Sequence, residues 1–208
     1  MINIYNGGRD TANWIMNNIK EYTEIKNKKN LDWGCGPARV VRHLPELVES
    51  TAHVFGTDYN PKTINWCKEN IADVTFNING INPPISYESD FFDIIYGVSI
   101  FTHLSEKNHP AWSKELARIL KKGGILMLTS HGEAYKTILT DSEVKEFNLG
   151  NLITRDQAIE GHRVFAAFHP PSYMIKLFHS AGLEILAHKP GLKKSWGIEQ
   201  DTWFLKKI

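Results

Sequence analysis

The chain has 208 residues, 42% of them hydrophobic, and a formal net charge of +1 at pH 7. A chain of this length and composition buries a core of its own, so we expect a single domain spanning residues 1–208. Charges of both signs are interspersed and form no basic stripe, which argues against a nucleic-acid partner. No run approaches the roughly 18 apolar residues of a membrane-spanning helix, so no membrane partner is expected.

The cysteines and the first residues bear on location. Cys35 and Cys67 are too few for a disulfide framework, and both are expected to be free thiols. The first ten residues contain no apolar core of the kind that an export signal needs. We therefore predict a cytoplasmic location. The histidines and acids show no tight metal-ligand spacing, and no metal is expected.

Short β-forming runs alternate with amphipathic helical patterns along the chain, as in βαβ units on a parallel sheet. The pattern predicts a first helix near residues 11–24 and a first strand that ends at Asp32. After a glycine-containing loop, a short helix is expected to stop at Pro45, because proline has no backbone N–H.

A second strand is predicted over residues 53–57, with Asp58 at its tip. Asn60 and Pro61 then match the N-cap and the first position of a helix. Residues 74–77 are expected to form the third strand.

The alternation continues into the second half of the sheet. Residues 92–98 predict a strand that is buried on both faces, and residues 110–122 predict a helix closed by Gly123 and Gly124. The apolar run over residues 125–129 is expected to be the fifth strand.

A last helix is predicted over residues 171–181, and Gly182 is expected to end it. Residues 183–188 and 202–206 predict two closing strands that pair like a hairpin. The predicted fold is therefore α/β: a Rossmann-like seven-stranded sheet, mostly parallel with the last strand antiparallel, with helices on both faces.

The loop after the first strand has the composition of a cofactor site. Gly34 and Gly36 can take positive φ and let a ligand touch the main chain. A carboxylate at Asp32 would repel a pyrophosphate, but it suits a positively charged amino acid group such as the methionine end of S-adenosylmethionine. Asp58 can accept hydrogen bonds from both ribose hydroxyls of an adenosine. The alternative for Asp58 is a helix cap, a role for which Asn60 is better placed.

Four motifs resemble those of class I S-adenosylmethionine-dependent methyltransferases. They are Leu31-Asp32-Trp33-Gly34-Cys35-Gly36, Gly56-Thr57-Asp58, Phe92-Asp93-Ile94-Ile95-Tyr96 and Leu120-Lys121-Lys122-Gly123-Gly124. The resemblance runs from about residue 31 to residue 129, and it departs from the family at Ala38, where a third glycine is common.

This resemblance implies S-adenosylmethionine as cofactor and S-adenosylhomocysteine as product. It places the methionine end at the glycine loop, the ribose at Asp58, the adenine at the turn 79–81 and the sulfur beside residues 99–101. The cofactor residues expected from it are Asp32, Gly34, Cys35, Gly36, Asp58, Tyr59, Asn79, Gly80 and Ser99.

The second half of the chain is similar to a smaller branch of that family, which methylates hydroxyls of small molecules or saccharides. The similarity rests on four short blocks: Phe101-Thr102-His103-Leu104, Ser130-His131-Gly132, Phe165-Ala166-Ala167-Phe168-His169 and Gln200-Asp201. It implies a small-molecule or saccharide acceptor.

A hydroxyl acceptor has to be aligned with the methyl group and lose a proton, a task that suits histidine at neutral pH. His131 is the first candidate base, because it follows the fifth strand and the carboxyl ends of strands face the ligand crevice. His103, after the fourth strand, and His169 are the next candidates. Since the chain has nine histidines, a packed or solvated role for each is the alternative.

Residues 132–168 are predicted to form an insertion or lid on the substrate side. Their aromatic residues Tyr135, Phe147, Phe165 and Phe168 could equally serve as core packing.

Two other classes remain open. A nicotinamide oxidoreductase would share the first βαβ unit, but it should lack an acid at position 32. A non-catalytic adenosine-binding scaffold would keep the loop, since fold does not imply function. The run Asn82-Pro83-Pro84-Ile85 resembles a signature of amino-group methylation on DNA bases, but it precedes the fourth strand and lacks the aromatic residue, so a rigid turn is the better interpretation.

Overall fold

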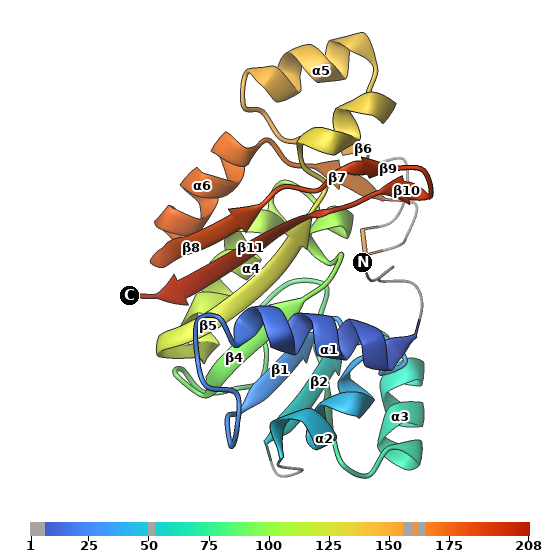
Figure 1. Cartoon of the computed structure of the whole chain (residues 1–208), viewed down its shortest axis with the longest axis vertical. Coiled ribbons are helices and arrows are strands. Elements are labelled where there is room, and N and C mark those ends of the chain that lie inside the picture. The colour runs from blue at the N-terminus through green and yellow to red at the C-terminus, as the bar shows by residue number, and fades with distance from the viewer. Residues whose placement is uncertain (1–6, 50–52, 156–159, 162–164) are drawn as a thin grey trace.

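The structure is a computed structural model, and it describes residues 7–49, 53–155, 160–161 and 165–208. Seven of the described strands form one sheet in the order β3-β2-β1-β4-β5-β11-β8 (Figure 1). Strands β1 to β5 pair in parallel, whereas β11 runs antiparallel to both of its neighbours, β5 and β8. The predicted sheet with its antiparallel last strand is confirmed. The strands are β1 (Asn30–Trp33), β2 (Val54–Asp58), β3 (Thr75–Ile78), β4 (Phe92–Gly97), β5 (Leu120–Ser130), β8 (Leu183–Lys189) and β11 (Asp201–Lys207).

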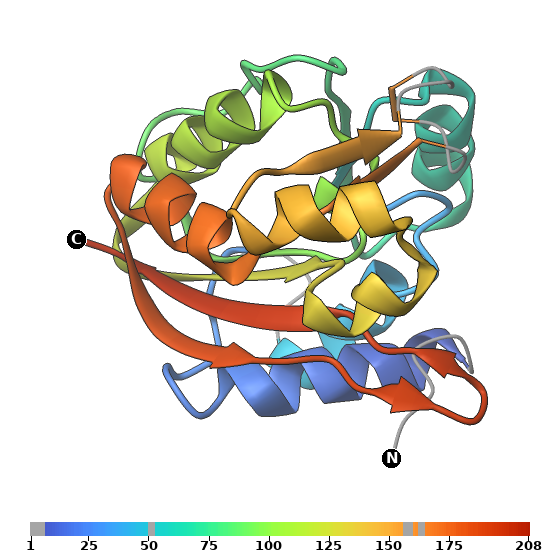
Figure 2. The ribbon, with the colours of Figure 1, turned by 90° about the horizontal axis from the view of Figure 1, so that it is seen from above.

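Helices cover both faces of the sheet, as Figure 2 shows from above. One face carries α1 (Gly8–Ile19), α2 (Leu44–Val48) and α3 (Pro61–Asn70). The opposite face carries α4 (Asn108–Ile119) and α6 (Pro171–Ser180).

The two faces have separate buried cores because side chains alternate along a strand. On β5, Ile125 and Met127 pack with the first group of helices, whereas Leu126 and Leu128 pack with the second. Both sets are nearly fully buried, so β5 is a central strand with two apolar faces.

Local signals fixed several element ends as predicted. Asn60 caps α3, where its side chain accepts a hydrogen bond from the Thr63 N–H at 3.2 Å, and Pro61 is the first helical residue. Gly182 follows α6 with a φ of +74°, a conformation that glycine adopts without steric cost.

Three helix predictions were wrong. The first helix, predicted near residues 11–24, begins at Gly8 and ends at Ile19. Pro45 lies in the first turn of α2 and begins that helix, because the first-turn N–H groups need no partner within a helix. The helix predicted over residues 110–122 ends at Ile119, and Leu120 already pairs with Phe92 as the first residue of β5. Gly123 and Gly124 therefore lie within the strand.

Smaller elements surround the sheet. The segment predicted as an insertion contains η3 (Glu133–Ile138), α5 (Asp141–Asn148), β6 (Ile153–Arg155) and β7 (Ala166–Phe168), while its residues 156–159 and 162–164 lie outside the described part. Phe147, Ile153 and Phe168 form a small core of their own there. The remaining elements are η1 (Val41–His43), η2 (Phe101–His103), β9 (Lys193–Lys194) and β10 (Gly197–Ile198).

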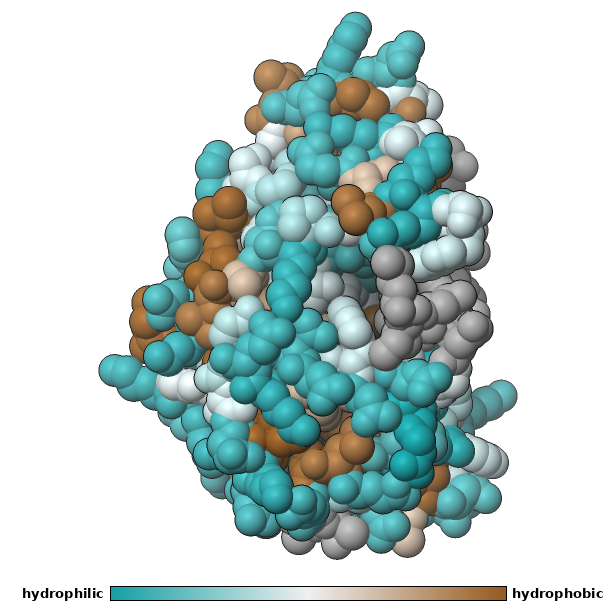
Figure 3. Space-filling model, viewed as in Figure 1, coloured by the Kyte–Doolittle hydropathy of each residue, from teal (hydrophilic) through white to brown (hydrophobic). Residues whose placement is uncertain are grey.

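The described residues include no helix of the length and apolarity needed to cross a membrane. They also contain no group of three or more His, Cys, Asp or Glu side chains that could hold a metal ion. The face in Figure 3 is mainly hydrophilic, and its apolar side chains occur in separate small groups.

Candidate cofactor and acceptor site

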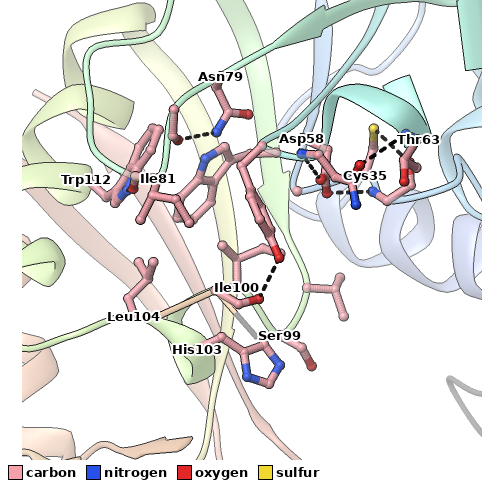
Figure 4. A pocket seen from close by; sticks show the side chains of 18 of the residues that line it. Cys35, Asp58, Thr63, Asn79, Ile81, Ser99, Ile100, His103, Leu104 and Trp112 are labelled. Atoms are coloured by element: carbon pink, nitrogen blue, oxygen red, sulfur yellow. Dashed lines mark hydrogen bonds between the residues drawn. The ribbon is translucent and has the colours of Figure 1, made fainter. Parts of the chain in front are cut away.

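A cavity of about 660 Å³ lies at the edge of the sheet where the parallel strands end (Figure 4). Segments that follow β1, β2, β3 and β4 line it. Eight of the nine predicted cofactor residues line the cavity: Gly34, Cys35, Gly36, Asp58, Tyr59, Asn79, Gly80 and Ser99. The ninth, Asp32, lies on β1 outside this lining and is 5% exposed.

The glycine loop is held against the end of β2. The N–H groups of Gly34 and Cys35 both donate to the Thr57 carbonyl, at 2.8 and 2.9 Å. Gly34 has a φ of +78°, and a Cβ there would lie 2.1 Å from Ile100 Cδ1. Gly36 has a φ of +51° and no neighbour within 4 Å of an added Cβ. Gly34 is therefore favoured by its conformation, and a Cβ there would displace the end of the Ile100 side chain, whereas Gly36 leaves bare main chain at the cavity.

Asp58 ties this loop to the start of α3. Its Oδ2 accepts from the Gly36 N–H at 3.0 Å, and its Oδ1 accepts from the Asn60 N–H at 2.9 Å. Each carboxylate oxygen has a further lone pair, and the side chain lines the cavity. Asp58 can therefore accept two hydroxyl donors while it holds the loop.

Asp32 is a buried carboxyl group with a raised pKa. Burial raises its pKa to about 7, the negative charge of Asp58 adds to the increase, and the nearby Tyr96 hydroxyl and Arg39 offset part of it. A ligand cation next to Asp32 would favour its ionised form, because opposite charges attract strongly in a poorly solvated site.

Residues 31–124 match a family model described as a methyltransferase domain. The fold is that of class I S-adenosylmethionine-dependent methyltransferases. S-adenosylmethionine is therefore the cofactor expected at this cavity, with S-adenosylhomocysteine as the product. The match does not favour a nicotinamide oxidoreductase.

Solved structures share the methyltransferase fold over almost the whole chain. A methyltransferase from Methanosarcina mazei is 18% identical, with a TM-score of 0.65 over 91% of this chain and 96% of its own. Magnesium protoporphyrin IX methyltransferase from Synechocystis, solved with bound S-adenosylhomocysteine, is 13% identical, with a TM-score of 0.66 over 96% and 83%. A protein described as a cyclase is 15% identical, with a TM-score of 0.64 over 98% and 85%. At these identities the likeness shows the fold alone.

The turn after β3 offers an unpaired acceptor to the cofactor of this methyltransferase. The Asn79 N–H donates to the Asp58 carbonyl at 3.1 Å, and its Nδ2 donates to the Gly80 carbonyl at 2.7 Å. Asn79 Oδ1 is buried and has no hydrogen-bond partner among the residues that the structure describes. Since buried acceptors are normally paired, this oxygen fits the exocyclic amino group of an adenine. The apolar side chains of Ile81 and Leu104 also line the cavity.

Arg39 is a site residue that the sequence reasoning missed. It lines the cavity just after the glycine loop, and its Nη1 donates to Thr11 Oγ1 at 3.3 Å. Ala38, at the position where the family commonly has glycine, has a φ of +58°. The chain thus turns sharply at Ala38, and Arg39 follows directly. Sequence reasoning could have identified Arg39 as a cation close to the predicted position of the cofactor's methionine carboxylate.

Of the three candidate bases of the methyltransferase, His103 is the one that lines the cavity. Its Nδ1 lies 2.9 Å from the Phe165 carbonyl oxygen. A carbonyl can only accept, so Nδ1 carries the hydrogen and Nε2 of the neutral ring keeps a free lone pair.

His131 and His169 lie outside this lining. His131 Nδ1 donates to the Ala167 carbonyl at 3.1 Å, and its ring stacks on Tyr135 at 4.0 Å. Burial lowers the pKa of His131 to about 4, which makes it a weak base. His169 is fully buried, with its Nε2 2.9 Å from His109 Nε2, and burial lowers its pKa further. The geometry therefore favours His103 over the first candidate, His131.

Proposed function

We propose that this protein methylates an uncharged hydroxyl of a small molecule or saccharide, with His103 as the general base. The observation that carries the proposal is the fixed imidazole at the cavity. Phe165 holds its Nδ1–H, so Nε2 is the free base.

For the cofactor, we assign the adenine to Asn79 and Gly80 and the ribose hydroxyls to Asp58. The methionine end falls to the glycine loop, where Asp32 would attract its ammonium group and Arg39 its carboxylate. The opposite charges of these two side chains suit an amino acid zwitterion.

S-adenosylmethionine supplies a methyl group activated on a sulfonium: the carbon–sulfur bond breaks as the carbon–oxygen bond forms, and S-adenosylhomocysteine leaves. The protein has to orient the acceptor and take its proton. His103 Nε2 accepts the proton of the hydroxyl, and the Phe165 carbonyl stabilises the imidazolium through Nδ1–H.

The charges of the cavity support a neutral acceptor. Among the described lining residues, the carboxylate and guanidinium groups are those of Asp58 and Arg39, both next to the glycine loop. The other end presents Ser99 and His103. A phosphate, carboxylate or ammonium acceptor would find no matching charge among them.

We further assign residues 132–168 to the acceptor side, because the carbonyls of Phe165 and Ala167 hold the two histidines that follow β4 and β5. The buried Phe147, Phe165 and Phe168 serve packing in this segment. The free, buried thiols of Cys35 and Cys67 fit the predicted cytoplasmic location.

A non-catalytic cofactor-binding protein is the second candidate, since the fold binds the cofactor without requiring that a methyl group be transferred. Calorimetric titration with S-adenosylhomocysteine, with NADH as control ligand, tests the cofactor site. We expect micromolar binding of S-adenosylhomocysteine alone, and its loss in Asp58→Ala.

Release of S-adenosylhomocysteine from S-adenosylmethionine, measured against a panel of neutral sugars, alcohols and phenols, separates the two candidates. Turnover that His103→Ala lowers at least a hundredfold would support the proposal. Binding without turnover of any hydroxyl would favour the scaffold, and NADH binding alone would contradict both.

A further inference from the structure

Three segments that are distant in the chain meet beside His103 at the acceptor end of the cavity. Ser99 follows β4, Thr129 lies near the end of β5, and Gln200 directly precedes β11. Because β11 is antiparallel, it starts where the parallel strands end, with Asp201 opposite Ser130. β11 therefore starts at the edge of the sheet where β5 ends (Figure 1), and Gln200, the residue before β11, lies at the ligand edge although it is near the end of the sequence.

These side chains form a closed ring of hydrogen bonds. The Ser99 N–H donates to Thr129 Oγ1 at 2.8 Å, and the Thr129 hydroxyl donates to Gln200 Oε1 at 2.6 Å. Gln200 Nε2 then donates to Ser99 Oγ at 2.6 Å. Ser99 Oγ is thus an acceptor within the ring, and its own hydrogen remains available to the cavity that Ser99 lines.

The backbone at Ser99 is held in an unfavourable conformation. Its φ is +62°, in the region that favours glycine, and Thr102 Oγ1 donates to its carbonyl at 2.7 Å. A serine in this region is strained relative to an ordinary conformation. Glycine would be unstrained at this position. The presence of serine therefore points to a role for its hydroxyl group.

Gln200 is placed by a rigid neighbour. Asp201 is 1% exposed, and its carboxylate accepts from His188 Nε2 at 2.6 Å and from the Gly191 N–H at 2.9 Å. A Cβ on Gly132 would lie 2.0 Å from Asp201 Oδ2, so this carboxylate packs directly on the chain after β5. The amide of Gln200 therefore approaches Ser99 from a fixed turn.

We propose that Ser99 donates its hydroxyl hydrogen to the acceptor atom, and that Gln200 is the positioning residue that sets this polarity. The proposal rests on the proposed function and deepens it. Figure 4 shows Ser99 and His103 together at the end of the cavity away from Asn79.

This arrangement selects oxygen over nitrogen. A hydroxyl oxygen has two lone pairs, so it can attack the methyl group with one, accept from Ser99 with the other, and give its hydrogen to His103. A neutral amine nitrogen has one lone pair, which the methyl transfer requires, and it cannot accept from Ser99 at the same time. An alcohol or phenol is therefore the acceptor class.

Gln200→Glu reverses the polarity of the ring. A carboxylate only accepts, so the Ser99 hydroxyl would turn toward the introduced carboxylate and present lone pairs to the cavity. Sinefungin, a cofactor analogue with an ammonium group in place of the methylsulfonium, reports this change without any acceptor. S-adenosylhomocysteine, which has no group at that position, is the matched control ligand.

We expect Gln200→Glu to tighten sinefungin at least tenfold, while S-adenosylhomocysteine changes less than twofold in calorimetric titrations. In the Ser99→Gly background, the same substitution should tighten sinefungin less than threefold, because the hydroxyl that transmits the change is gone. Thermal unfolding of each variant checks that the fold is intact.

The proposal would be overturned if Gln200→Glu changed the affinities of sinefungin and S-adenosylhomocysteine equally, or if it tightened sinefungin at least tenfold in the Ser99→Gly background. Either result would leave the cofactor assignment unaffected. If the wild-type protein bound neither ligand, the proposed function would fail and this inference with it. A second readout is turnover of phenol and aniline: Gln200→Glu should raise the aniline-to-phenol ratio at least tenfold, and an unchanged ratio would count against the inference.

Discussion

Asp32 should make cofactor binding depend on pH. Its pKa is about 7 in the free protein, chiefly because it is buried. About one tenth of the protein then has an ionised Asp32 at pH 6, and about nine tenths at pH 8. If the ionised carboxylate holds the ammonium group of S-adenosylhomocysteine, affinity rises about tenfold between these pH values, because binding has to compete with protonation.

Calorimetry at pH 6, 7 and 8 measures this directly. Asp32→Asn should bind S-adenosylhomocysteine more weakly and with a flat profile, since the amide does not titrate. His103→Gln is the control variant at the opposite end of the cavity, and it should keep the tenfold rise. A flat profile in the wild type, or the same slope in Asp32→Asn, would refute the reasoning.

The same carboxyl affects stability, and the sign follows from its raised pKa. The unfolded chain releases the Asp32 proton near pH 4, whereas the folded protein holds it to about pH 7. The free energy of unfolding therefore falls as pH rises from about 4 to about 7, by up to about 4 kcal/mol in total. Urea unfolding across this range should show a smaller fall for Asp32→Asn; parallel curves for the two proteins would contradict the assignment.

Three further outcomes are expected. His103→Ala should abolish hydroxyl methylation while His131→Ala retains most of it, as judged by S-adenosylhomocysteine release; the reverse order would return the base to His131. Gly34→Ala should lower the free energy of unfolding by about 2–5 kcal/mol in urea, because a Cβ would lie 2.1 Å from Ile100 Cδ1 at a φ of +78°; a loss below about 1 kcal/mol would show that the loop adapts. Ser99→Gly should be about 1 kcal/mol more stable than Ser99→Ala, because both lose the hydroxyl and glycine alone relieves the strain; equal stability would argue against that strain.

The lining of the cavity around the glycine loop and Asp58 could be predicted from the sequence because its signals are local. The glycine loop follows β1 within a few residues, and Asn60 and Pro61 define the start of α3 through contacts between near neighbours. Asp58 could be located because it directly follows a short predicted strand and precedes the Asn60-Pro61 helix start. Such features depend on φ preferences and nearby hydrogen bonds, which a sequence states directly.

Other predictions failed where two local rules competed. Pro45 can end one helix or begin the next, and the packing of α2 decides between them. Leu120 has high helix propensity, yet pairing with Phe92 makes it part of β5.

The acceptor half could not be read from the sequence, because it is assembled by chain pairing over long distances. His103 reaches the cavity with its ring fixed by Phe165, 62 residues later, whereas His131 is turned onto Tyr135. Gln200 meets Ser99 across 101 residues only because β11 runs antiparallel. The sequence by itself determined the fold class and the cofactor loop, since those follow from neighbouring residues. The tertiary structure alone decided which histidine and which hydroxyl line the cavity, because strand order and direction set those distances.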